Sequence, residues 1–275
     1  MIDLLETAPP PALHIHLTRP PETAEDWTIP QHWERFTAEE HRVWDILFAR
    51  QKEKLHGRVV RAFEDGLDVL ALSRPGIPEL GELNDRLHAR TRWTVVSVPG
   101  LVPDDIFFQH LANRRFPAGN FIRSASQLDY LEEPDVFHDV FGHVPMLAQP
   151  QVADFMQALG EAGLDALGKG AIHRLARLYW YTVEFGLARE DGALKIYGAG
   201  IASSFEESTY ALESPIPVRR PFEMERVLRT RYRSDALQLG YFVVDSFEDL
   251  LGQIAGADLE RLYETVEALG DVDPA

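Results

Sequence analysis

Residues 133–147 read EPDVFHDVFGHVPML, and this stretch says more about the fold and the function than any other part of the chain. His138 and His143 lie five residues apart, with Gly142 between them and Pro145 just beyond. An unbroken α-helix turns about 500° over five residues and would point the two rings in different directions. Glycine commonly ends a helix, and proline discourages its continuation. We therefore expect the helix to end at Gly142, so that His143 turns back toward His138 and shares a metal ion with it.

Two carboxylates accompany these histidines. Asp135 precedes His138 by three residues, and Asp139 precedes His143 by four. A histidine bound to a metal usually donates its second N–H to a carboxylate or a carbonyl, which fixes the tautomer of the ring. Both acids are therefore expected to orient the rings. The alternative is that the histidines are ordinary surface or core residues, because so short a motif often occurs without a metal.

A third ligand is expected in the stretch ARLYWYTVEFGL, residues 176–187, where Glu184 stands among aromatic and aliphatic residues. An ionised carboxylate buried among apolar side chains needs a strong partner, and a metal ion is one of the few that suffice. An ion pair with Arg177 on the same helix, or an exposed position, would explain Glu184 equally well at this point.

The ligand set allows more than one chemistry. Two histidines and one carboxylate are typical of non-haem iron oxygenases, which keep coordination positions open for dioxygen and a second ligand. A zinc hydrolase can use the same three residues. A helical binding module in which these residues are purely structural is the third alternative. The identity of the three residues does not choose between these readings.

The rest of the chain is mostly helical in pattern, because apolar residues recur every three or four positions between glycines and prolines. The fold class expected is mainly α with a few short strands (α+β). A proline-rich arm is expected over residues 1–30 and a single domain over residues 31–275. Helices are predicted at 38–55, 57–72, 77–91, 103–116, 126–133, 134–142, 150–168, 171–190, 203–213, 223–233, 246–256 and 258–270. Short strands are predicted at 93–100, 194–201, 216–222 and 241–247.

Composition removes several classes of function. The formal charge is 27 − 44 = −17, and no basic stripe offers a surface for nucleic acid or an anionic membrane. The chain has no cysteine, which excludes disulfides, thiolate metal sites and a cysteine nucleophile. We find neither a basic, continuously apolar leader nor a run of about 20 apolar residues, and so expect a cytoplasmic protein. The last helix is too short for a coiled-coil seam of about 3 to 4 heptads, which favours a monomer.

Several blocks in order resemble the pterin-dependent aromatic amino acid hydroxylases, above all the short bacterial phenylalanine 4-hydroxylases. The resemblance runs from about Asp26 to Phe247. It implies a single-domain helical basket with iron(II) on His138, His143 and Glu184. It also implies a tetrahydropterin, either tetrahydrobiopterin or a related reduced pterin, and conversion of free L-phenylalanine to L-tyrosine with dioxygen. The blocks are VPGLVPDDIFFQHLANRRFP (98–117), QLDYLEEPDVFHDVFGHVPML (127–147), ARLYWYTVEFGL (176–187) and IYGAGIASS (196–204).

The resemblance also assigns pterin contacts. Phe107 matches the aromatic residue that stacks on the pterin ring, a suitable task for a flat π-face. Leu101 and Val102 match the turn whose backbone bonds to the edge of the pterin. Asp139 and Tyr179 match neighbours of the pterin and of the iron.

Substrate contacts follow in the same way. Arg123 matches the residue that holds the carboxylate of the amino acid, for which a guanidinium provides two parallel hydrogen bonds. Trp180 matches a wall of the aromatic pocket, and Ser203 and Ser204 match the loop beside the amino acid and His138. Ordinary core packing would also account for Trp180.

The chain departs from the family's animal members in ways that limit what is carried over. Their separate regulatory domain and tetramerising helix have no counterpart, so their activation and their tetramer are not expected here. Pro117 and Leu131 replace a histidine and a threonine. Tryptophan hydroxylases tend to carry phenylalanine at the position of Trp180, which favours phenylalanine as the substrate; tryptophan and tyrosine stay as alternatives.

Overall fold

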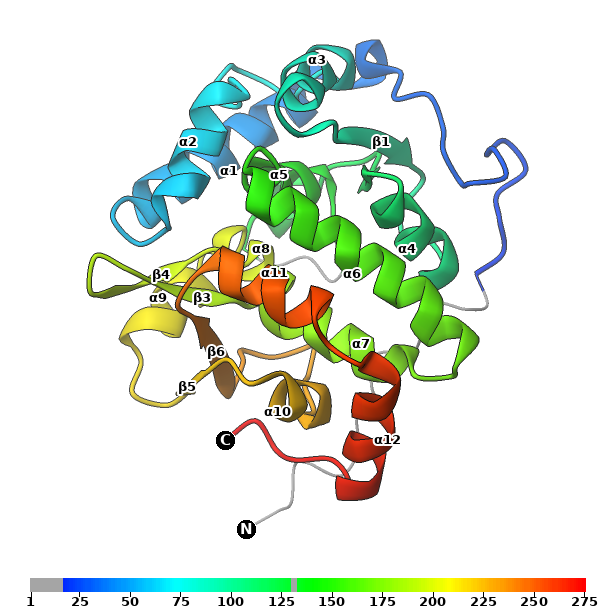
Figure 1. Ribbon diagram of the computed structural model, residues 1–275. Coiled ribbons are helices and arrows are strands. Elements are labelled where there is room, and N and C mark those ends of the chain that lie inside the picture. Colours follow the sequence, from blue (N-terminus) through cyan, green and yellow to red (C-terminus); the bar gives the residue numbers. More distant parts are fainter. Residues whose placement is uncertain (1–16, 130–132) are drawn as a thin grey trace.

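A computed structural model of the chain describes residues 17–129 and 133–275 (Figure 1). Residues 1–16 of the predicted arm, the end of the helix predicted at 126–133 and the departure at Leu131 lie outside this range. Helices dominate and strands are few and short, which confirms the predicted fold class. The α-helices are α1 (Ala38–Leu55), α2 (Arg61–Val69), α3 (Leu80–Thr91), α4 (Asp104–Ala112), α5 (Val144–Leu147), α6 (Pro150–Gly168), α7 (Ile172–Tyr179), α8 (Ala199–Ala202), α9 (Glu207–Glu213), α10 (Met224–Arg229), α11 (Phe247–Ala255) and α12 (Leu259–Leu269).

Four further helical segments among the described residues are not α-helical. Two are short 3₁₀ turns and two are π-helices, in which each N–H bonds to the carbonyl five residues back. In the described part of the helix predicted at 126–133, the second 3₁₀ turn is the helical segment observed. The segments are η1 (Trp33–Arg35), η2 (Ala125–Gln127), η3 (Phe137–His143) and η4 (Trp180–Glu184).

Six strands in the described part of the chain form two small sheets. β1 and β2 pair in parallel, and the other sheet has the order β4-β3-β6-β5. The prediction of a helix over residues 171–190 is wrong beyond η4. The last residues of this range form β3, which pairs with β4 and β6. The strand predicted at 194–201 likewise ends early, and α8 follows it. The strands are β1 (Thr94–Val98), β2 (Arg115–Gly119), β3 (Leu187–Glu190), β4 (Ala193–Ile196), β5 (Val218–Pro221) and β6 (Gly240–Val244).

Helix α6 runs across the molecule, and α4 and α11 pack along it (Figure 1). Small residues permit the close approach of α4. A Cβ atom on Gly163 would lie 2.2 Å from the ring of Phe108, so only glycine fits. One hydrophobic cluster extends from Val43 to Val266. This continuity supports, as a proposal, a single domain over residues 31–275.

The described part of the N-terminal arm lies against the body. Trp27 is buried and packs with Val98 and Val102 in a small separate cluster. The carbonyl of Asp26 lies 2.8 Å from His110 Nε2, and its carboxylate pairs with Arg115 at 2.8 Å. This end of the arm therefore covers the side of β1 and α4 from which the predicted pterin residues come.

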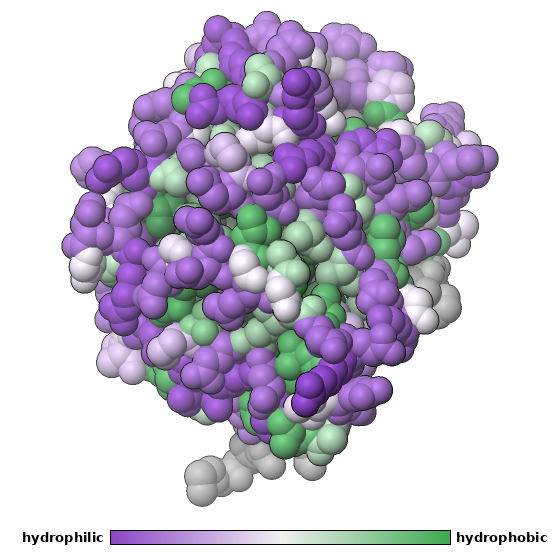
Figure 2. Space-filling view, viewed as in Figure 1, coloured by the Kyte–Doolittle hydropathy of each residue, from purple (hydrophilic) through white to green (hydrophobic). Residues whose placement is uncertain are grey.

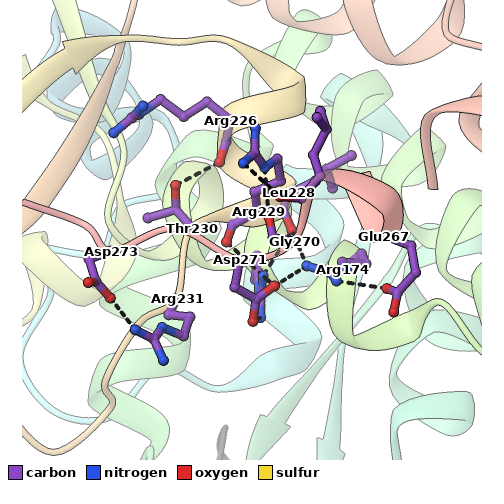
Figure 3. A network of polar contacts seen from close by, with 12 residues as sticks. Arg174, Arg226, Leu228, Arg229, Thr230, Arg231, Glu267, Gly270, Asp271 and Asp273 are labelled. Atoms are coloured by element: carbon purple, nitrogen blue, oxygen red, sulfur yellow. Dashed lines mark hydrogen bonds and ion pairs between the residues drawn. The ribbon is translucent and has the colours of Figure 1, made fainter. Parts of the chain in front are cut away.

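The C-terminal tail, residues 270–275, bonds to α7 and to the segment that follows α10 (Figure 3). Asp271 pairs with Arg177 through two hydrogen bonds of 2.8 Å, and it also accepts from Arg174. Both arginines are buried and lie on α7. Val272 forms a parallel bridge with Thr230, just after α10. The tail thus ties α7 to the segment that follows α10.

Hydrophilic residues cover most of the face in Figure 2, as expected for a chain with a net charge of −17, and apolar side chains show mainly toward its middle. Among the described residues, none of the helices combines the length and the apolar character that a membrane crossing requires.

Candidate metal centre and aromatic pocket

The two histidines are brought together by η3. Residues five apart lie on the same side of a π-helix, because its hydrogen bonds join positions i and i+5. His138 and His143 are such a pair, and their Nε2 atoms lie 3.3 Å apart. The expectation that the helix ends at Gly142 is wrong, since the helix continues through Gly142 into α5. The structure gives a different reason for glycine at position 142: a Cβ atom there would lie 3.0 Å from the carbonyl oxygen of Ala199.

Glu184 is delivered by the other π-helix. It is the last residue of η4, and the next N–H, from Phe185, bonds to the carbonyl of Trp180 at 2.8 Å. Tyr179 lies five residues before Glu184, and its hydroxyl helps to lower the pKa of that carboxylate. All three candidate ligands therefore belong to π-helices, a form that occurs frequently at functional sites.

The three side chains converge on one point. Glu184 Oε1 lies 3.1 Å from His143 Nε2, and Glu184 Oε2 lies 3.6 Å from His138 Nε2. One ligand atom from each residue lies within 4.8 Å of the other two. The alternative ion pair between Glu184 and Arg177 is not formed, because Arg177 binds Asp271 instead.

The electrostatics of the cluster suit a divalent metal ion. Burial lowers the pKa of His138 to about 4, so its ring is neutral at physiological pH. Burial alone would raise the pKa of Glu184, but the two histidines and the hydroxyl of Tyr179 outweigh it and lower that pKa to about 2. The neutral ring of His138, the ring of His143 and the carboxylate of Glu184 thus face a common centre. Iron(II) accepts this donor set.

The groups that orient the histidines differ from those expected. His138 Nδ1 lies 2.8 Å from the hydroxyl of Ser203. Asp135 instead accepts from the backbone N–H of His138 at 3.0 Å, and Asp139 accepts from the N–H of Gly119 at 2.8 Å. Neither acid binds a ring as predicted. Nδ1 of His143 is buried and has no hydrogen-bond partner among the described residues.

Arg123 is held rigidly beside the cluster. Its Nε and Nη2 atoms bond to the two oxygens of Asp135 at 2.8 and 2.9 Å, and both side chains are buried. The remaining terminal nitrogen, Nη1, has no partner among the described residues. Asp135 therefore fixes the plane of the guanidinium, and both N–H groups of Nη1 stay available.

Three of the residues assigned to the pterin, Val102, Phe107 and Tyr179, contact one another in turn. Phe107 packs edge-on against Tyr179, with ring centroids 5.4 Å apart. Val102 is buried with Phe107 against it, whereas Leu101 is exposed and its N–H lies 3.3 Å from a Glu133 carboxylate oxygen. Burial raises the pKa of Asp139 to about 7. These side-chain contacts run from Val102 through Phe107 to Tyr179, whose hydroxyl affects the pKa of Glu184.

Trp180 lies between two aromatic rings. The centroid of Phe185 is 4.6 Å away and that of Tyr232 is 4.3 Å away. Its indole N–H donates to Gln238 Oε1 at 3.0 Å. Tyr232 and Gln238 were missed in the sequence, because nothing local marks residues that meet Trp180 from more than 50 positions away. Ser204 does not contact His138; its hydroxyl accepts from the N–H of Glu207.

Comparisons with known proteins agree with this geometry and confirm the resemblance. A sequence model of the biopterin-dependent aromatic amino acid hydroxylases matches residues 27–264. The phenylalanine-4-hydroxylase of Caulobacter vibrioides is 56% identical over 256 residues, which cover 93% of this chain and 87% of that protein. The Ralstonia nicotianae enzyme of the same name is 53% identical and covers 89% and 78%. A crystal structure of Chromobacterium violaceum phenylalanine hydroxylase with iron and phenylalanine bound has a TM-score of 0.87 at 45% identity, covering 92% of each chain.

Proposed function

This chain belongs to the family of biopterin-dependent aromatic amino acid hydroxylases, and on that premise we propose that it hydroxylates free L-phenylalanine to L-tyrosine. Iron(II) and a tetrahydropterin are its cofactors, and dioxygen is the second substrate. The observation that carries the proposal is the convergence of His138, His143 and Glu184, two imidazoles and one carboxylate, within 4.8 Å. Relatives named phenylalanine-4-hydroxylase at 50–56% identity favour phenylalanine over tyrosine and tryptophan.

The chain's own residues have distinct tasks in this proposal. His138, His143 and Glu184 hold the iron, which with the reduced pterin supplies the electrons for activating dioxygen. Arg123 binds the carboxylate of the amino acid, and Trp180 forms a wall of the pocket that receives its ring. Orientation and exclusion of water are the protein's contribution to a reaction whose chemistry belongs to the cofactors.

The pterin is proposed to lie on the side of the site formed by Leu101, Val102, Phe107, Asp139 and Tyr179. Phe107 offers a partly buried ring for stacking, and Asp139 offers a carboxyl group that is close to half-protonated at neutral pH. Such a carboxyl group can donate or accept a hydrogen bond, which suits the mixed donors and acceptors of a pterin edge. Ser203 and Ser204 are proposed to line the amino acid side.

The test is turnover by the reconstituted protein. Metal is removed with a chelator, and iron(II), tetrahydrobiopterin, air and L-phenylalanine are supplied; tyrosine and oxidised pterin are measured together. Tyrosine formation that needs all four components is expected. Parallel assays with tryptophan and tyrosine rank the substrates. Hydrolytic activity of the zinc-loaded protein without pterin or dioxygen, together with no tyrosine formation by the iron-loaded protein, would contradict the proposal and favour a hydrolase.

Glu184→Gln provides the matched control. It keeps the shape of the side chain but removes its charge, so iron binding and tyrosine formation should both be lost while the helical circular dichroism is retained. Retained iron binding would remove Glu184 from the ligand set. We further propose a monomer acting in the cytoplasm; size-exclusion chromatography with light scattering tests the first part, and cell fractionation tests the second.

A further inference from the structure

The indole of Trp180 is fixed on three sides. Phe185 covers one face at an interplanar angle of 33°, and Tyr232 lies against the ring at 21°. These stacking contacts hold the plane of the indole. They do not determine which edge of the indole points inward, because a stacked ring can turn within its plane. The hydrogen bond from Trp180 Nε1 to Gln238 Oε1, 3.0 Å, is the directional contact.

Gln238 is itself held in one orientation. Its side chain is buried, and its Nε2 donates to the carbonyls of Arg233 and Ala236 at 2.8 and 3.0 Å. Both amide protons are therefore used. A flipped amide would direct N–H groups at the indole N–H and carbonyl oxygen at two carbonyls, which is repulsive at both ends. Oε1 must face Trp180.

A buried carboxylate anchors the backbone beneath this amide. Glu207 Oε1 accepts from the N–H of Gln238 at 3.1 Å and from the hydroxyl of Tyr241. The N–H of Glu207 in turn donates to the hydroxyl of Ser204. The loop that carries Gln238 is thus joined to the loop at the amino acid side of the metal centre. Ser204 belongs to the assigned site, whereas Gln238, Glu207 and Tyr241 do not.

From this network we infer that Gln238 is a positioning residue that locks the orientation of the Trp180 indole and thereby sets which aromatic ring the pocket accepts. The inference rests on the proposed function, in which Trp180 forms a wall of the pocket. A wall held by one directional bond, with Tyr232 stacked on it and Phe185 tilted against it, cannot swing aside for a larger side chain. Without the bond, the indole can turn, and the pocket should admit indole-sized substrates more readily.

A spectroscopic experiment tests the contact without any turnover. The chain has five tryptophans, which give five indole N–H resonances in a ¹H–¹⁵N spectrum of the metal-free protein. The Trp180 resonance is assigned by its loss in Trp180→Phe. Gln238→Met, which keeps an unbranched side chain but lacks the acceptor, should move that resonance upfield and leave the other four in place. Gln253→Leu, at an exposed position on α11, is the control.

A kinetic cycle tests the consequence. In the wild-type background, Gln238→Met should raise KM for phenylalanine about threefold to tenfold, the usual net contribution of one hydrogen bond. It should leave kcat within about twofold and lower the preference for phenylalanine over tryptophan. In the Trp180→Phe background the same substitution should have little further effect, because the donor is gone; coupled residues show such non-additivity.

The role of Gln238 and the hydroxylase activity can fail independently of each other. If Gln238→Met raises KM by the same factor in both backgrounds, or leaves the Trp180 resonance unmoved, Gln238 does not act through the indole and the inference fails. If wild-type protein makes no tyrosine, the proposed function fails while the resonance shift still tests the contact. Should Gln238→Met not fold, as judged by circular dichroism, Gln238→Leu takes its place in the same cycle.

Discussion

His138 Nδ1 and Ser203 Oγ lie 2.8 Å apart, and the hydroxyl proton of Ser203 is directed at the carbonyl of Ala199, also at 2.8 Å. The serine oxygen can therefore only accept from the histidine, which must carry its proton on Nδ1. Nε2 is left with a free lone pair facing His143 and Glu184. A single hydroxyl thus selects the tautomer that binds a metal.

Ser203→Ala should weaken iron binding because the wrong tautomer of His138 becomes accessible. The loss should be about 10- to 100-fold in affinity, which is the usual effect of removing such an orienting group. Competition with a chromogenic chelator measures it. The exposed Ser126, changed to alanine, is the matched control. Unchanged iron affinity in Ser203→Ala would show that the tautomer is set by other contacts.

Arg123→Lys should impair the use of phenylalanine far more than it impairs folding. Lysine keeps the charge but cannot bind both oxygens of Asp135 and a second carboxylate in one plane. We expect KM for phenylalanine to rise about tenfold or more, which corresponds to about 1.4 kcal/mol, with KM for the pterin nearly unchanged. Steady-state kinetics with each substrate varied in turn give the answer. Equal increases in both values would contradict a carboxylate-binding role.

Gly66→Ala should destabilise the protein strongly. A Cβ at this position of α2 would lie 2.2 Å from the carbonyl oxygen of Pro145, two residues beyond His143. Overpacking against backbone costs about 1–3 kcal/mol in the free energy of unfolding, and this contact falls at the upper end. Gly168→Ala, at the end of α6 with no neighbour within 4 Å, should be neutral or slightly stabilising. Urea unfolding of both variants provides the comparison.

The tail ion pair should make stability depend on pH. Arg177 and Arg174 hold the pKa of Asp271 well below its usual range, despite the opposing effect of burial. A carboxyl group whose pKa is lower in the folded state contributes stability above its unfolded pKa of about 3.9, and this contribution is lost as the pH falls toward the folded value. Asp271→Asn should therefore lower the free energy of unfolding at pH 7 by about 1–2 kcal/mol, since the carboxylate is 36% exposed.

The same comparison repeated at lower pH checks the sign. The difference between wild type and Asp271→Asn should shrink between pH 5 and pH 3, because the carboxyl group then becomes protonated in the unfolded wild-type chain while it stays ionised in the folded protein. Urea unfolding at pH 7, 5, 4 and 3 measures it. A difference that stays constant over this range would mean that the charge of Asp271 makes no contribution.

Much of the helical framework was predictable, because its signals are local. Thr37 and Glu40 form a reciprocal cap at the start of α1, and its predicted bounds are those observed. The span of α6, which begins at Pro150 and ends at Gly168, was also predicted. His138, His143 and Glu184 could be selected as a group because burying a carboxylate demands a partner. Their role as iron ligands remains a prediction.

The rest depends on contacts that leave no local pattern. A π-helix differs from an α-helix by one residue in its hydrogen bonding, so the spacing of His138 and His143 was explained by a helix end at Gly142 instead. The strand β3 forms only because β4 and β6 arrive to pair with it. Ser203 and His138 are 65 positions apart in the sequence, and no local pattern around either residue predicts their hydrogen bond.

The attachment of Asp271 to α7 has a consequence for how the protein is made. Asp271 is synthesised 97 residues after Arg174, and until it emerges the two arginines of α7 lack the anion that neutralises them in their buried position. The helix that leads into Glu184 is therefore neutralised only after a segment more than 90 residues further along the chain has docked. Iron loading before that point should be disfavoured, because α7 and the glutamate that follows it are not yet held in place.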